Sequence, residues 1–110
     1  MGVRNKTKNT IIVDKIRVAR SVKDKMIGLL RSDKPEVLLL KTHFGIHTFG
    51  MKYAIDVMIL DTNNKVAKLK ASLPPNRIFL WNPTHETVIE MPEGLIEKTR
   101  TEVGDTIELT

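Results

Sequence analysis

The chain contains no cysteine, which excludes disulfide bonds, thiolate catalysis, iron–sulfur clusters and the usual structural zinc sites. Aromatic residues make up only 5% of the 110 residues, so few side chains are available for a base-stacking platform. No apolar run approaches the roughly 18 residues that a transmembrane helix needs, and we expect no membrane partner. Residues 1–8 are polar and basic with no apolar stretch behind them, unlike a signal peptide, so we expect a cytoplasmic protein.

The residues that are present are typical of one soluble globular domain. Hydrophobic residues account for 41% and charged residues for 28% of the chain. Eighteen Lys and Arg against 13 Asp and Glu leave a net charge of +5, and the basic residues are dispersed along the chain. A dispersed surplus favours solubility over a nucleic-acid footprint. Binding to nucleic acid or another anionic surface is therefore the third of our functional hypotheses, and we expect a monomer.

The pattern of apolar and polar residues predicts an α+β fold. Residues 1–9 are expected to be a frayed basic N-terminus, which leaves 10–110 as the domain. We predict a compact, mostly antiparallel β-sheet or partly closed barrel with two short helices. The expected strands are 10–19, 36–41, 55–60, 65–71, 77–81, 86–91 and 106–109, and the expected helices are 21–30 and 92–100.

Two of these strands are apolar on both faces, which is typical of strands in the middle of a covered sheet. They are 36–41 and 55–60, and we predict that they lie side by side. The turn-forming segment 61–64 predicts a hairpin between 55–60 and 65–71. A second pair is expected between 77–81 and 86–91.

Residues able to carry chemistry gather in the segment 42–56, between the two apolar strands. His43 and His47 are four residues apart, but in a strand or loop this spacing separates them by about 13 Å. With no cysteine or Glu-x-x-His beside them, we predict no metal site and no cofactor. Asp56 opens an apolar strand, so its carboxylate needs a partner, which His47 or Lys52 could supply. A structural ion pair or a turn-capping role for Asp56 is the alternative interpretation.

Four sequence elements occur in a characteristic order. They are Gly28-Leu29-Leu30-Arg31, the segment 46–61 beginning Ile46-His47-Thr48-Phe49-Gly50-Met51-Lys52, Val88-Ile89-Glu90-Met91-Pro92-Glu93-Gly94, and Val103-Gly104-Asp105. Together they resemble the elements of the DUF192 (UPF0127) family, although this chain is one residue short before the arginine of the first. The resemblance covers about residues 10–109, implies a β-rich domain with small helices and brings no established biochemical function. The polar positions that match the family pattern are His47, Lys52, Asp56, Asp61, Glu90 and Asp105.

The function we favour from the sequence is a binding module for a small ligand or peptide, because function commonly lies on loops over a rigid scaffold. We predict that the side chains of His47, Lys52, Asp56 and Glu90 lie within reach of one another, at the mouth of a pocket partly walled by Phe49 and Met51. An enzyme that uses His47 with Asp56 or Glu90 as an acid–base pair is the alternative, and no catalytic residue is assigned. The candidate ligand-binding residues are His47, Phe49, Met51, Lys52, Asp56 and Glu90.

Overall fold

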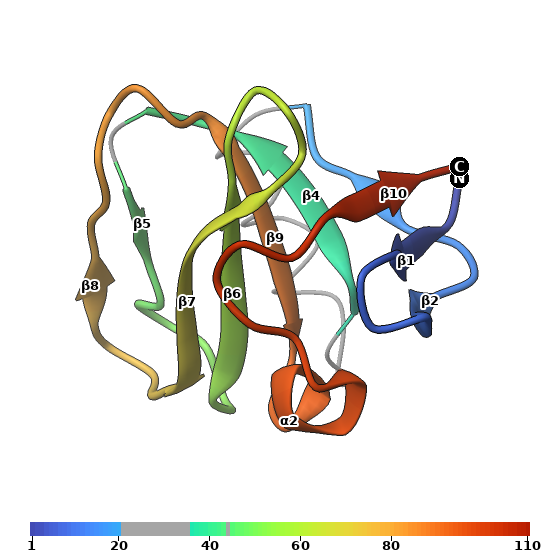
Figure 1. Cartoon of the computed structure of the whole chain (residues 1–110). Helices are drawn as coiled ribbons and strands as arrows, with labels where there is room; N and C mark the ends of the chain where they lie inside the picture. The colour runs from blue at the N-terminus through green and yellow to red at the C-terminus, as the bar shows by residue number, and fades with distance from the viewer. Residues whose placement is uncertain (21–35, 44) are drawn as a thin grey trace.

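The computed structural model describes residues 1–20, 36–43 and 45–110, and within these ranges it is built mostly from β-strands (Figure 1). The predicted helix 21–30 lies outside the described residues. In chain order the elements are β1 (Val3–Asn5), β2 (Thr10–Val13), β3 (Arg17–Val18), β4 (Leu38–Lys41), β5 (Ile46–His47), β6 (Ile55–Leu60), β7 (Val66–Leu73), β8 (Ile78–Phe79), β9 (Thr87–Pro92), α2 (Leu95–Thr99) and β10 (Ile107–Leu109).

A five-stranded sheet with the order β3-β4-β9-β6-β7 forms the centre of the molecule. The β3–β4 pair is parallel and the others are antiparallel. Both strands with two apolar faces, β4 and β6, are interior, as the sequence predicted. They are not neighbours, however, because β9 lies between them. The prediction that they lie side by side is wrong: β9 is itself apolar on both faces, with Val88, Ile89 and Met91 buried, and competes for the same central place.

The predicted hairpin of β6 and β7 is confirmed, and its turn residue Asn64 adopts a left-handed backbone with φ of 59°. The second predicted pair, 77–81 with 86–91, is wrong. Strand β8 pairs instead with β5 in a separate two-stranded ribbon, while β9 joins the central sheet. Two strands that are adjacent in the sequence can therefore be predicted to pair only where the turn between them is tight.

The N-terminal residues are part of the fold, so the expected fraying is wrong for residues 3–5. Strand β1 pairs antiparallel with both β2 and β10, and Val3 is buried. Gly2 and Thr110 exchange backbone hydrogen bonds of 2.8 and 3.0 Å, so the chain ends lie together, as Figure 1 shows. The predicted strand 10–19 divides into β2 and β3, which belong to different sheets.

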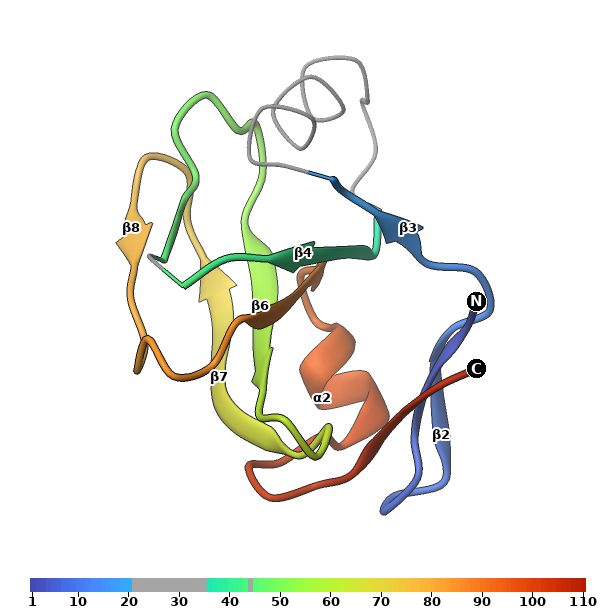
Figure 2. The same ribbon diagram turned by 90° about the horizontal axis from the view of Figure 1, so that it is seen from above.

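Two apolar clusters cover the two faces of the central sheet. On one face, Met58 and Ile89 pack with residues of the three-stranded sheet β10-β1-β2 and of α2. On the other face, Val57 and Val88 pack with Ile46 and Phe79 of the β5–β8 ribbon. Figure 2 shows α2 and β8 on opposite sides of β6. Residues that alternate along β6 therefore point into different halves of the core.

The fold class within the described residues is mostly β with one short helix, arranged as three sheets and not as a closed barrel. The predicted helix 92–100 is shorter than expected. Strand β9 continues through Pro92, and α2 begins after Gly94, whose φ is 94°. None of the helices in these ranges is long and apolar enough to cross a membrane.

Candidate functional site

His47 lies on the outer face of the β5–β8 ribbon, directly opposite Ile78. Its imidazole stacks on the ring of Phe49, with 4.9 Å between the ring centroids and 25° between the planes. The Nδ1 atom of His47 accepts the backbone N–H of Phe49 at 3.3 Å, and within the described residues Nε2 makes no hydrogen bond. Phe49 is 50% exposed, so the stacked pair presents aromatic surface to solvent.

Two aliphatic side chains extend this aromatic surface. Ile78 is 63% exposed and Leu80 is 60% exposed, while Phe79 between them is buried in the core. Gly45 directly precedes β5, and its lack of a side chain makes room for Leu80. A Cβ at Gly45 would lie 2.6 Å from the Leu80 Cδ2 atom. We name the four side chains of His47, Phe49, Ile78 and Leu80 the His47 surface.

Ile78 and Leu80 are not among the site residues predicted from the sequence. The run Ile78-Phe79-Leu80-Trp81 is apolar at every position, and such a run indicates a strand buried on both faces. In the structure only Phe79 and Trp81 of this run are buried. A two-stranded ribbon offers one face to the core and leaves the other to solvent, so the alternate pair is exposed.

Basic side chains lie beside the His47 surface. The Lys68 ammonium donates to the Leu80 carbonyl at 2.8 Å and lies 4.8 Å from the centroid of the Phe79 ring. Arg77 precedes Ile78 and is exposed, and Lys52 follows Phe49 by three residues and is also exposed. Three basic residues therefore neighbour the His47 surface, Lys68 through its bond to the Leu80 backbone and Arg77 and Lys52 through their places in the sequence.

The base of this surface is held by Thr48, which is fully buried. Its hydroxyl donates to the Pro74 carbonyl at 2.7 Å and accepts the backbone N–H of Arg77 at 2.9 Å. These bonds fix the segment before β8 against the residue that follows His47. The spacing between Phe49 and Ile78 is thus set by a buried hydroxyl.

Asp56 has a different environment from the one predicted. It is 1% exposed, and its carboxylate accepts three backbone N–H groups, from Ser72 at 3.0 Å, Gly94 at 3.1 Å and Ile96 at 2.9 Å. The first of these stabilises an irregularity in the β6–β7 pairing, where Ser72 has a φ of 54°. The other two cap the start of α2. The capping interpretation of Asp56 is therefore supported.

The predicted proximity of His47 and Asp56 is wrong. Asp56 points to the face of the central sheet that carries α2, whereas the β5–β8 ribbon packs on the other face. Within the described residues the two side chains share no hydrogen bond, because backbone amides from distant segments satisfy the carboxylate. Glu90 lies on the same face as the ribbon, in register with Val57 and Leu38, and is 3% exposed. Met51 is partly buried against the same apolar cluster.

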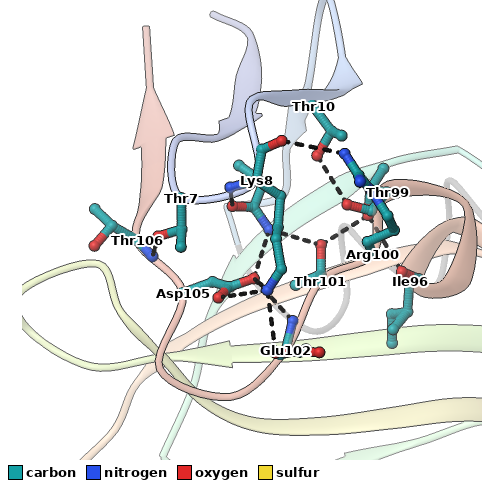
Figure 3. Close-up of polar contacts among 11 residues, drawn as sticks. Thr7, Lys8, Thr10, Ile96, Thr99, Arg100, Thr101, Glu102, Asp105 and Thr106 are labelled. Carbon is teal, nitrogen blue, oxygen red and sulfur yellow. Dashed lines mark hydrogen bonds and ion pairs between the residues drawn. The ribbon is translucent and has the colours of Figure 1, made fainter.

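A polar network ties the two chain ends together, and it contains Asp105 (Figure 3). The Asp105 carboxylate accepts from the Asn5 side chain at 2.9 Å, from the Glu102 N–H at 2.9 Å and from the Lys8 ammonium at 3.2 Å. Burial alone would raise the pKa of Asp105, but these hydrogen bonds and the Lys8 charge outweigh it and hold the pKa below 3.8. Because all of its partners are structural, Asp105 serves the fold.

The histidine pair considered as metal ligands is divided between two sites. His43 Nε2 lies 3.1 Å from a carboxylate oxygen of Glu86, and its Nδ1 lies 2.8 Å from the Pro83 carbonyl, whereas His47 stacks on Phe49. Within the described ranges, no three His, Asp or Glu side chains are placed to hold a metal ion together.

Comparison with known proteins identifies relatives across nearly the whole chain. The profile of DUF192, described as an uncharacterized ACR, matches residues 3–109. A UPF0127 protein of Pyrococcus horikoshii is 34% identical over 110 residues, covering 94% of each chain. A UPF0127 protein of Pyrococcus furiosus is 31% identical over 111 residues, again covering 94% of each.

The fold is shared with a solved structure. A protein of unknown function from Novosphingobium aromaticivorans has a TM-score of 0.78 over 98% of this chain and 82% of that chain, at 16% identity. Similarity at this level of identity concerns the fold alone. The family match spans the segment of this chain that contains His47, Thr48 and Phe49. The chain belongs to the DUF192 (UPF0127) family.

Proposed function

We propose that this protein is a binding module that takes a short peptide with apolar side chains and acidic neighbours on the His47 surface. The observation that supports the proposal is the exposure of three large apolar side chains, each at least half exposed, around one imidazole. Contiguous exposed apolar surface rimmed by polar groups is typical of interaction sites. A surface kept only for solubility would carry polar residues at Ile78 and Leu80.

The charge at the margin favours an acidic partner. Arg77 and Lys52 are exposed beside the apolar side chains, and Lys68 lies against the ribbon. Positive groups around an apolar centre attract carboxylates and orient them, while the apolar contacts supply most of the affinity. The Nε2 atom of His47 adds a polar contact at the centre. Aromatic and aliphatic side chains of a peptide would contact Phe49 and Ile78.

The experiment is selection of a random peptide display library on the immobilised protein, followed by affinity measurement with labelled peptides. We expect enrichment of peptides that combine large apolar residues with Asp or Glu. The variant Ile78→Ser should weaken their binding at least tenfold. The matched control is Ile11→Ser, since Ile11 is 66% exposed, close to the 63% of Ile78, but lies on β2. Arg77→Glu should weaken the acidic peptides and reduce the salt dependence of their affinity.

Three results would overturn the proposal. One is a selection that enriches no sequence, and another is binding that Ile78→Ser and Ile11→Ser affect equally. The third is preferential binding of oligonucleotides with a steep dependence on salt, which would favour the hypothesis of an anionic-surface binder. A catalytic turnover of the selected peptides that requires His47 would instead support the enzyme hypothesis.

A further inference from the structure

A second site shares none of its described lining residues with the His47 surface. It is a cavity of about 340 Å³ where β4 and β6 end and β9 begins. Its lining is polar: the residues that matter here are Lys41, His43, Asp61, His85, Glu86 and Thr87. A volume near the lower end of the range for ligand pockets suits a small molecule.

The sheet register sets the distance between the two charges of this cavity. Lys41 of β4 and Leu60 of β6 both pair with Thr87 of β9, so the three residues form a row across the sheet. Two strand spacings separate the ends of the row, or about 10 Å between backbones. Asp61 directly follows Leu60. An ammonium and a carboxylate therefore approach the cavity from opposite sides of β9.

The Lys41 ammonium is positioned and retains capacity to bind. It donates to the Thr87 hydroxyl at 2.8 Å, and within the described part of the chain its other two N–H donors make no hydrogen bond. His43 Nε2 lies 3.1 Å from a carboxylate oxygen of Glu86, so that carboxylate has a partner within the cavity. Among the described residues that line the cavity, Lys41 is the one lysine or arginine, and it is the cation that a ligand meets.

The Asp61 carboxylate is the matching negative group. Its Oδ1 atom accepts the backbone N–H groups of Asn63 at 2.8 Å and Lys65 at 3.0 Å, whereas within the described residues Oδ2 makes no hydrogen bond. The bond from Lys65 is the main reason that the pKa of Asp61 is lowered, so the group is ionised at neutral pH. The imidazole of His85, likewise without a hydrogen bond in the described part of the chain, lies near enough for its charge to favour this ionisation.

We infer that this cavity binds a small zwitterion of the free α-amino acid class. The ligand carboxylate pairs with Lys41, and the ligand ammonium pairs with Asp61 Oδ2. A molecule with one charge would pair with only one of the two groups and should therefore bind more weakly than a zwitterion. The loop that carries His85 is braced: the Trp81 indole donates to the His85 carbonyl at 2.7 Å, and the Asn82 side chain accepts the Thr84 N–H.

The experiment is a titration of the 15N-labelled protein with each free L-amino acid, followed by amide chemical shifts. Propylamine and propionate serve as single-charge probes, and glucose serves as a neutral polyhydroxyl probe. We expect at least one small amino acid to shift the amides of residues 60–64 and 84–87 in a saturable manner. Neither single-charge probe should shift them at the same concentration.

Variants separate recognition from folding. Asp61→Asn keeps an oxygen that can accept both turn N–H groups while it removes the charge, and Lys41→Met keeps the aliphatic stem. Each should weaken amino-acid binding at least tenfold, because a charged hydrogen bond is lost in each case. Lys70→Met, on the exposed face of β7, is the matched control and should leave the affinity unchanged. The inference is overturned if no amino acid shifts these amides, if propionate or glucose binds as well, or if both charge variants bind normally.

Discussion

The side-chain carboxylate of Asp56, on β6, accepts the backbone N–H of Ile96 at 2.9 Å and thereby joins the central sheet to the first turn of α2. The residue before that helix is Gly94, which has no side chain to cap it. A carboxylate from a strand 38 residues away in sequence takes the place of a local cap. This placement explains how a charged residue is tolerated in an otherwise apolar strand.

Replacing this carboxylate should destabilise the protein without affecting the His47 surface. In Asp56→Ala, the N–H groups of Ser72, Gly94 and Ile96 lose their acceptor, and we expect a loss of about 2–4 kcal/mol in the free energy of unfolding. Asp56→Asn keeps one acceptor oxygen and should lose less. Urea denaturation measures both variants. A loss below about 1 kcal/mol for Asp56→Ala would show that these bonds matter little.

The stability of the protein should fall in acid partly through Asp105. Its pKa is lower in the folded state than the ordinary value of 3.8, so its contribution is fully present above that value. The contribution is lost as the pH falls through the lower, folded-state pKa. Free energies of unfolding measured between about pH 6 and pH 2.5 should therefore decline more steeply for the wild type than for Asp105→Asn. Parallel curves would contradict this assignment.

The buried hydroxyl of Thr48 should be more important than its methyl group. Thr48→Val leaves the Pro74 carbonyl and the Arg77 N–H without their partner, and we expect a loss of about 1–3 kcal/mol in the free energy of unfolding. Thr48→Ser keeps both hydrogen bonds and should cost about 1 kcal/mol for the lost methyl group. Thermal or urea unfolding compares the two. Equal losses would mean that packing, and not hydrogen bonding, fixes this segment.

Alanine substitutions at Gly45 and Gly50 should separate the effect of backbone strain from that of steric contact. Gly45 and Gly50 both have positive φ, 95° and 80°, so alanine at either position is strained by about 1–2 kcal/mol. A Cβ at Gly45 would also lie 2.8 Å from the Phe79 carbonyl oxygen, whereas none of the described atoms lies within 4 Å at Gly50. Gly45→Ala should therefore destabilise the protein more than Gly50→Ala, as measured by unfolding midpoints. The reverse order would contradict the close approach of β5 and β8.

Local patterns predicted the elements whose formation depends on neighbouring residues. The two-sided apolar runs at 36–41 and 55–60 predicted interior strands, and the turn-forming residues 61–64 predicted the β6–β7 hairpin. The motif around His47 identified the family. It also drew attention to the segment that carries His47 and Phe49. These predictions succeeded because the burial of a strand and the geometry of a tight turn are determined by a few consecutive residues.

The order of the strands and the partners of the site residues depend on contacts between segments that are distant in the sequence. The interior position of β9, the docking of Val3 beside β10 and the pairing of β5 with β8 all join segments that are distant in the sequence. Asp56 and His47 are nine residues apart, yet they lie on opposite sides of the central sheet, and distant backbone amides satisfy the carboxylate. Local patterns specify how apolar a strand is but not which strand will cover it. The choice among equally apolar partners is made only when the whole core packs together.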